Sequence, residues 1–190
     1  KKEKKEKKEK PPAPEKAEGE AGGQSDVSKL DIRVGLIVSV ERHPEAEKLY
    51  VEKVDLGEPS GPRTVVSGLV DFMPPEALLN KHAVLLCNLK PAKMRGIESQ
   101  AMVMAASNED KSVVELLLPP DGVPPGERIA FDGHPGEPLP PNQIAKKKVW
   151  EAVQPDLCTD GECVARYRDV AFGTSKGPCK VASIKKGTIK

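Results

Sequence analysis

Three basic side chains and a glycine lie between two apolar runs in the stretch CNLKPAKMRGIESQAMVMAAS, residues 87–107. Lys90, Lys93 and Arg95 are donors of the kind that bind phosphate oxygens, and Gly96 permits a tight turn beside them. The pattern predicts a basic loop that the flanking strands present to a polyanion. The alternative is an ordinary solvated hairpin, since basic surface loops are common.

Other polar residues are placed to assist these cations. Asn88, Ser99 and Gln100 belong to the same segment and could bind backbone or base edges. Ser67 closes a predicted strand, and we expect it to lie on the same face as the loop.

The flanking elements follow from periodicity. Residues 30–40 alternate apolar and polar with period two, which indicates a half-buried strand, and Gly35 in its middle predicts a bend or bulge. Further strands are expected over residues 49–57, 63–70, 81–89 and 99–107, with a short helix over residues 74–80 before the fourth strand. This order is typical of the OB-fold, a five-stranded barrel that binds oligonucleotides, and it makes the basic segment the loop between strands 4 and 5.

The sequence predicts an all-β dominated protein in three parts. Residues 1–25 form a Lys/Glu/Pro-rich linker or tail expected to be disordered, residues 26–131 the OB-fold, and residues 132–190 a small α+β subdomain packed on the barrel. In the subdomain we expect a helix over residues 143–157 and short strands after it. The sets that could add phosphate contacts are Lys4, Lys5, Lys7 and Lys8 of the tail, and Lys146, Lys147 and Lys148, although consecutive lysines on one helix would fan out.

Composition restricts the function. The net charge is only +1, so a polyanion site must come from local clustering, and few aromatic residues are available for stacking bases. No stretch approaches a membrane span, and no signal-peptide pattern begins the chain. No catalytic motif is found, and no cofactor is expected.

The four cysteines are expected to be reduced thiols of a cytosolic protein, with Cys87 in the core. A zinc site made of Cys158, Cys163, Cys179 and His134 is an alternative, but the spacings fit no common zinc motif, so we expect no metal.

Several long stretches resemble one family. SKLDIRVGLIVSVERHPEAEKLYVEKVDLGE, NLKPAKMRGIESQAM and KKKVWEAVQPDL are similar to the tRNA-binding domain typified by endothelial-monocyte-activating polypeptide II. That domain also ends human tyrosyl-tRNA synthetase and plant-type methionyl-tRNA synthetases. The likeness runs from about residue 26 to the end of the sequence.

The resemblance implies an OB-fold that binds tRNA through shape and backbone, with little discrimination among tRNA species and no catalysis. It implies a monomer, because the C-terminal unit would cover the barrel as a second subunit does in bacterial relatives. The residues on the family's signature loop and strand are Asn88, Lys90, Lys93, Arg95, Ser99, Gln100 and Met102.

The expected role is to raise the local tRNA concentration for an aminoacyl-tRNA synthetase, attached in cis or bound in trans, in the cytoplasm. An appendix of a plant-type methionyl-tRNA synthetase is the favoured origin, and a free-standing multisynthetase cofactor is the alternative. A protein-interaction or cytokine-like module of the same family is a further alternative. Leu36 stands where cytokine members carry a basic residue, which argues against cytokine activity.

Overall fold

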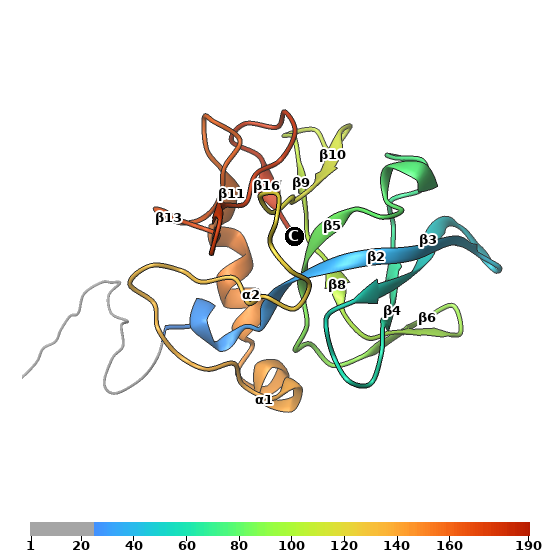
Figure 1. Cartoon of the computed structure of the whole chain (residues 1–190), viewed down its shortest axis with the longest axis horizontal. Helices are drawn as coiled ribbons and strands as arrows, with labels where there is room; N and C mark the ends of the chain where they lie inside the picture. Colours follow the sequence, from blue (N-terminus) through green and yellow to red (C-terminus); the bar gives the residue numbers. More distant parts are fainter. Residues whose placement is uncertain (1–24) are drawn as a thin grey trace, which may run out of the picture.

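A five-stranded antiparallel sheet forms the first half of the fold in the computed structural model, which describes residues 25–190 (Figure 1). Its strand order is β4-β3-β2-β5-β8. β2, β3 and β4 pair in the order of the sequence, and β5 then pairs with the other edge of β2. The strands are β2 (Ile32–His43), β3 (Ala46–Asp55), β4 (Arg63–Ser67), β5 (His82–Leu86) and β8 (Met102–Val103). All five predicted strands therefore exist, in the order expected for an OB-fold.

Gly35 is not the bulge that the sequence predicts. It pairs with Ala83 of β5 in regular register, and the two shifts in the β2–β3 pairing occur between Ile37 and Ser39 and between Arg42 and His43. A Cβ atom on Gly35 would lie 2.6 Å from a methyl carbon of Val54, which is closer than packed carbon atoms approach. The glycine is required for close packing across the barrel interior rather than for chain bending.

The predicted fifth strand, residues 99–107, is divided between two sheets. β8 pairs with β5, whereas β9 (Ala105–Ser107) leaves the barrel and joins a six-stranded sheet. The remaining strands of that sheet are β10 (Val114–Leu116), β16 (Thr188–Ile189), β11 (Leu157–Thr159), β12 (Ala165–Tyr167) and β13 (Val170–Ala171). A separate short hairpin pairs β14 (Gly173–Thr174) with β15 (Gly177–Pro178). The six-stranded sheet thus continues from the barrel into the C-terminal region.

Helices are shorter than predicted. The expected helix over residues 74–80 is the single 3₁₀ turn η2 (Pro75–Ala77), and further 3₁₀ turns are η1 (Val27–Lys29) and η3 (Gln154–Asp156). The expected helix over residues 143–157 is broken into α1 (Pro141–Lys146) and α2 (Val149–Val153). Lys148 has a left-handed backbone with φ of 51°, which ends the first helix and redirects the chain.

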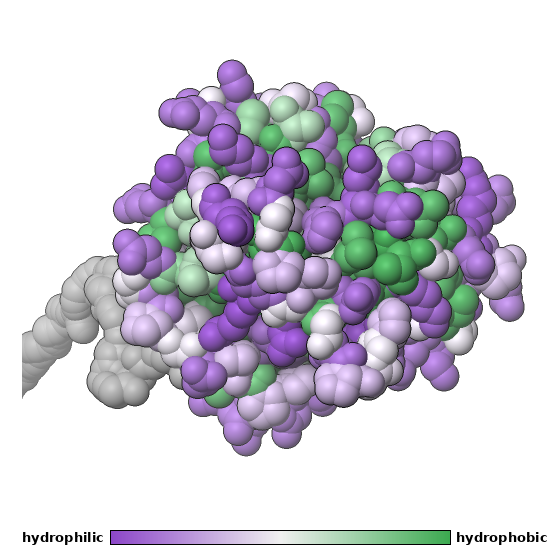
Figure 2. All heavy atoms as spheres, in the orientation of Figure 1, coloured by the Kyte–Doolittle hydropathy of each residue, from purple (hydrophilic) through white to green (hydrophobic). Residues whose placement is uncertain are grey.

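The larger hydrophobic cluster joins both halves of the chain. It contains Val34, Val84 and Met104 from the first half, together with Ile144 and Phe172 from the second. A smaller cluster around Tyr50 fills the barrel. Hydrophilic residues cover much of the face in Figure 2, and apolar residues gather over the barrel side. This shared core fixes the C-terminal region against the barrel.

Within residues 25–190 no helix is long and apolar enough to cross a membrane. The described residues also contain no group of three or more His, Cys, Asp or Glu side chains that could hold a metal ion, so the zinc alternative has no ligand set there. All four cysteines are free, and Cys87 is buried in the core, as predicted. Burial raises the pKa of the Cys87 thiol to about 12, so this cysteine is unsuited to nucleophilic chemistry.

Candidate nucleic-acid interface

The basic segment forms its own hairpin. β6 (Ala92–Met94) pairs with β7 (Ile97–Ser99) in regular register, so the predicted loop contains two further short strands. The connecting residues, Arg95 and Gly96, have φ values of 51° and 89°. Positive φ at both central positions is typical of the tightest two-residue hairpin turns. The sequence forms this turn because glycine adopts such a conformation without strain.

The hairpin exposes the predicted cations. Lys90, Lys93 and Arg95 are all exposed, and none of the ion pairs within residues 25–190 involves them. Glu98 lies opposite Lys93 in the register, without a salt bridge between the two. The three positive charges are therefore available to phosphate groups.

Asn88 and Ser99 lie inside the protein rather than on its surface, with exposed fractions of 5% and 6%. The Asn88 side chain accepts a hydrogen bond from a backbone N–H and donates to two backbone carbonyls. Ser99 Oγ accepts from the N–H of Val66 at 2.9 Å and donates to the carbonyl of Ala101 at 2.8 Å. Both residues therefore hold the two ends of the hairpin segment in place.

Gln100 joins the end of the hairpin to β4. Its backbone N–H donates to the carbonyl of Thr64 at 2.7 Å, and its side-chain oxygen accepts from the N–H of Thr64 at 2.9 Å. The exposed Gln100 side chain is thus partly engaged. Ser67 and Met102 are half-buried and line a groove that Met94 of the hairpin also lines.

His43 contacts the hairpin, which the sequence did not indicate. It is 4% exposed at the end of β2. Its Nδ1 accepts a 3.0 Å hydrogen bond from the N–H of Glu45, which assigns the proton to Nε2, and Nε2 donates to the carbonyl of Met94 at 2.9 Å. This contact joins residues 51 positions apart and fastens the hairpin tip to the barrel.

We expect His43→Ala to weaken the binding of a polyanion to the hairpin roughly fivefold, the equivalent of one lost hydrogen bond of about 1 kcal/mol. An isolated two-stranded hairpin is marginally stable, so its amide hydrogens should also exchange faster. Hydrogen exchange of residues 92–99 and a titration with RNA check both effects. His82→Ala, at an exposed histidine on β5, is the control and should change neither. Unchanged exchange in His43→Ala would contradict the fastening role.

The three consecutive lysines lie at a helix junction. Lys146 ends α1, whereas Lys147 and Lys148 connect it to α2, and all three side chains are exposed. The fanning expected on one continuous helix does not apply to them. Lys4, Lys5, Lys7 and Lys8 lie outside the described residues.

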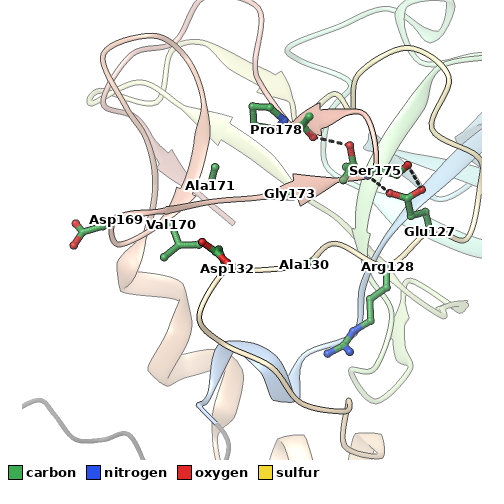
Figure 3. Close-up of a pocket in the computed structure, with 12 residues that line it drawn as sticks. Glu127, Arg128, Ala130, Asp132, Asp169, Val170, Ala171, Gly173, Ser175 and Pro178 are labelled. Atoms are coloured by element: carbon green, nitrogen blue, oxygen red, sulfur yellow. Dashed lines mark hydrogen bonds between the residues drawn. The ribbon is translucent and has the colours of Figure 1, made fainter.

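A separate hollow of about 740 Å³ is lined by residues of the segments 127–132 and 169–178 (Figure 3). Glu127, Asp132 and Asp169 contribute carboxylates to it, and Ser175 binds Glu127 through its backbone N–H and hydroxyl, each at 2.7 Å. The Arg128 guanidinium points away from the hollow and donates to backbone carbonyl groups. This acidic lining is unsuited to a phosphate backbone.

Comparison with known proteins identifies the family. The model of the family described as "Putative tRNA binding domain" matches residues 32–128, which include the basic hairpin. A probable methionine–tRNA ligase of Oryza sativa is 56% identical over 86% of this chain and 20% of its own length. Aminoacyl tRNA synthase complex-interacting multifunctional protein 1 of Cricetulus griseus is 55% identical over 87% of this chain and 45% of its own. This chain therefore spans less than half the length of either relative.

Solved structures agree in fold. The C-terminal domain of Plasmodium vivax p43 is 36% identical, with a TM-score of 0.77 over 87% of this chain and 99% of that domain. A MetRS-related protein from Pyrococcus horikoshii is 39% identical, with a TM-score of 0.50 over 54% of this chain and 91% of its own. The OB-like fold is confirmed, and the matched region is a binding module rather than an enzyme. The chain belongs to the family of putative tRNA-binding domains.

Proposed function

We propose that this protein binds tRNA through the β6–β7 hairpin, with phosphate oxygens meeting Lys90, Lys93 and Arg95. The observation that carries the proposal is the exposure of these three cations on one hairpin, without acidic partners in residues 25–190. Counterion release from the tRNA backbone supplies the free energy of such contacts. Family membership supports tRNA as the polyanion.

The proposed binding has little preference among tRNA species, since contacts to phosphate carry no base information. Gln100, Ser67 and Met102 border the contact surface, whereas the buried Asn88 and Ser99 act through the loop that they hold. Auxiliary phosphate contacts come from Lys146, Lys147 and Lys148, and from the tail residues Lys4, Lys5, Lys7 and Lys8.

The protein's role is to deliver tRNA to an aminoacyl-tRNA synthetase in the cytoplasm, in cis or in trans. Relatives named as cytoplasmic methionine–tRNA and tyrosine–tRNA ligases, at 52% and 50% identity, support this assignment. The gain is an effective concentration of tRNA near the catalytic domain. The hydrophobic core shared between the barrel and the C-terminal region supports a monomer. The favoured parent protein is a methionyl-tRNA synthetase, of which this chain would be the appended domain.

The test is a mobility-shift titration of unfractionated tRNA at several salt concentrations. Lys93→Ala/Arg95→Ala should bind roughly tenfold more weakly, which is about 1.4 kcal/mol. The slope of log K against log salt should become shallower by about 2, because each lost phosphate contact changes it by about 1.

The matched control is Lys176→Ala/Lys180→Ala, which removes two exposed lysines elsewhere. It alters net charge equally and should retain nearly wild-type affinity and slope. Equal losses in both variants would mean that overall charge, rather than the hairpin, binds tRNA. Wild-type affinity in the hairpin variant would reject the hairpin as the site.

A further inference from the structure

A groove of about 500 Å³ lies beside the basic hairpin, between the barrel and the C-terminal region. Ser67 and Phe72 border it from β4 and the following turn, Met94 from the hairpin, Met102 from β8 and Trp150 from α2. Met94 follows Lys93 and precedes Arg95 in sequence. The same hairpin that presents the cations therefore forms one wall of the groove.

The apolar side chains of this groove are incompletely covered. Phe72 is 40% exposed and Met94 is 39% exposed, while Met102 and Trp150 are half-buried. Aromatic rings such as those of Phe72 and Trp150 stack against planar ligands, and the polarisable sulfur atoms of methionines make favourable contacts with aromatic rings. Ser67 and Gln154 also line the groove. The Ser67 hydroxyl already donates to Glu52 and the Gln154 amide to the carbonyl of Ile189, so their oxygen atoms and the second amide hydrogen are what can bind the edge of a planar ligand.

Charge separates this groove from the acidic hollow of Figure 3. No aspartate or glutamate is among its described lining residues, whereas Lys111 and Lys190 are. The hollow of Figure 3 carries the carboxylates of Glu127 and Asp132 instead. Of these two, only the groove beside the hairpin suits a ligand that carries phosphate.

We propose that this groove binds an unpaired base of the RNA whose phosphates the hairpin holds. The inference rests on the proposed function and adds a base-binding subsite to it. Met94 lines the groove and is the chain neighbour of both Lys93 and Arg95, so an RNA strand whose phosphates bind at the hairpin passes close to the groove. Stacking on aromatic side chains tolerates every base, since each has a π face, so the subsite preserves binding to many tRNAs.

Phe72→Ala tests the subsite. The stacking free energy of one base predicts a fivefold to tenfold loss of tRNA affinity in the titration described above. The salt slope should stay at the wild-type value, because no phosphate contact is removed. Phe72→Tyr keeps the ring and should bind as wild type does. The control is Leu79→Ala, an equally exposed apolar residue on the same connection at 41%, which should bind normally.

Trp150 provides a readout without mutation, because it is the only tryptophan in the sequence. Its fluorescence should be quenched by a single-stranded oligoadenylate, and Phe72→Ala should weaken that quenching. Unchanged tRNA affinity in Phe72→Ala, or no quenching while wild type binds tRNA, would overturn the subsite and leave the hairpin proposal standing. Failure of the wild-type protein to bind any tRNA would overturn the proposed function itself.

Discussion

Replacing Glu52 by glutamine is expected to stabilise the protein by about 3 kcal/mol at pH 8 and to change its stability little at pH 4.5. Glu52 is fully buried on β3, where one oxygen accepts a hydrogen bond from Ser67 Oγ and the other has no partner within residues 25–190. Burial raises its pKa from 4.5 to about 7, although the Ser67 hydroxyl opposes the shift.

The direction of the effect follows from proton binding. Between pH 4.5 and about pH 7 the folded state keeps the Glu52 proton, whereas the unfolded state has lost it. The free energy of unfolding therefore decreases as pH rises through this window and levels off above about pH 7. Glutamine stays neutral throughout, so the variant should lack this decrease.

Urea unfolding at pH 5, 6, 7 and 8 measures the difference. Glu41→Gln, at an exposed glutamate on the neighbouring strand β2, is the control and should follow the wild-type profile. If Glu52→Gln also followed that profile, another group would have to cause the pH dependence. Since Ser67 lines the groove, tRNA titrations over the same pH range would report whether the Glu52 charge reaches the RNA.

Local patterns predicted the scaffold of the site well, because alternation and turn residues act within a few positions of each other. The exposed Lys93 and Arg95 and the buried Cys87 follow from such patterns. The role of Gly35 could not be predicted from such patterns, because a glycine is needed there only where Val54 and Leu85 approach from two other strands. A glycine within a strand pattern indicates a bulge, a bend or a close approach of another segment, without distinguishing among them.

The sequence also did not predict that residues 99–107 are divided between two sheets. Met104 donates its N–H to Val84 in the barrel, while its carbonyl accepts from Leu117 beside the second sheet. One continuous alternating pattern thus serves two sheets, because both of its faces are buried by different partners. His43 is similar, since its partner Met94 is distant in sequence. Periodicity predicts that a segment is a strand, but contacts between distant residues determine which sheet or hairpin it joins.

Asn88→Ala is expected to destabilise the protein by about 2–4 kcal/mol, because it leaves the N–H of Asp31 and the carbonyl of Leu139 without partners in the interior, whereas the Lys29 carbonyl keeps the N–H of Leu139. Asn88 Oδ1 accepts from the N–H of Asp31 at 2.9 Å, and Nδ2 donates to the carbonyls of Lys29 and Leu139 at 2.9 and 2.8 Å. These groups belong to the start of the barrel and to the segment before α1. One side chain therefore ties two distant segments to the base of the hairpin.

Urea unfolding of Asn88→Ala measures the loss, with Asn142→Ala, at an exposed asparagine on α1, as a control that should cost little. A loss below about 1 kcal/mol would contradict the structural role. The same variant distinguishes positioning from direct contact with tRNA. If Asn88 acts through the hairpin, affinity should decrease together with stability, and hydrogen exchange of residues 92–99 should accelerate. A loss of affinity at unchanged stability would instead place Asn88 in contact with the RNA, as the family resemblance implies.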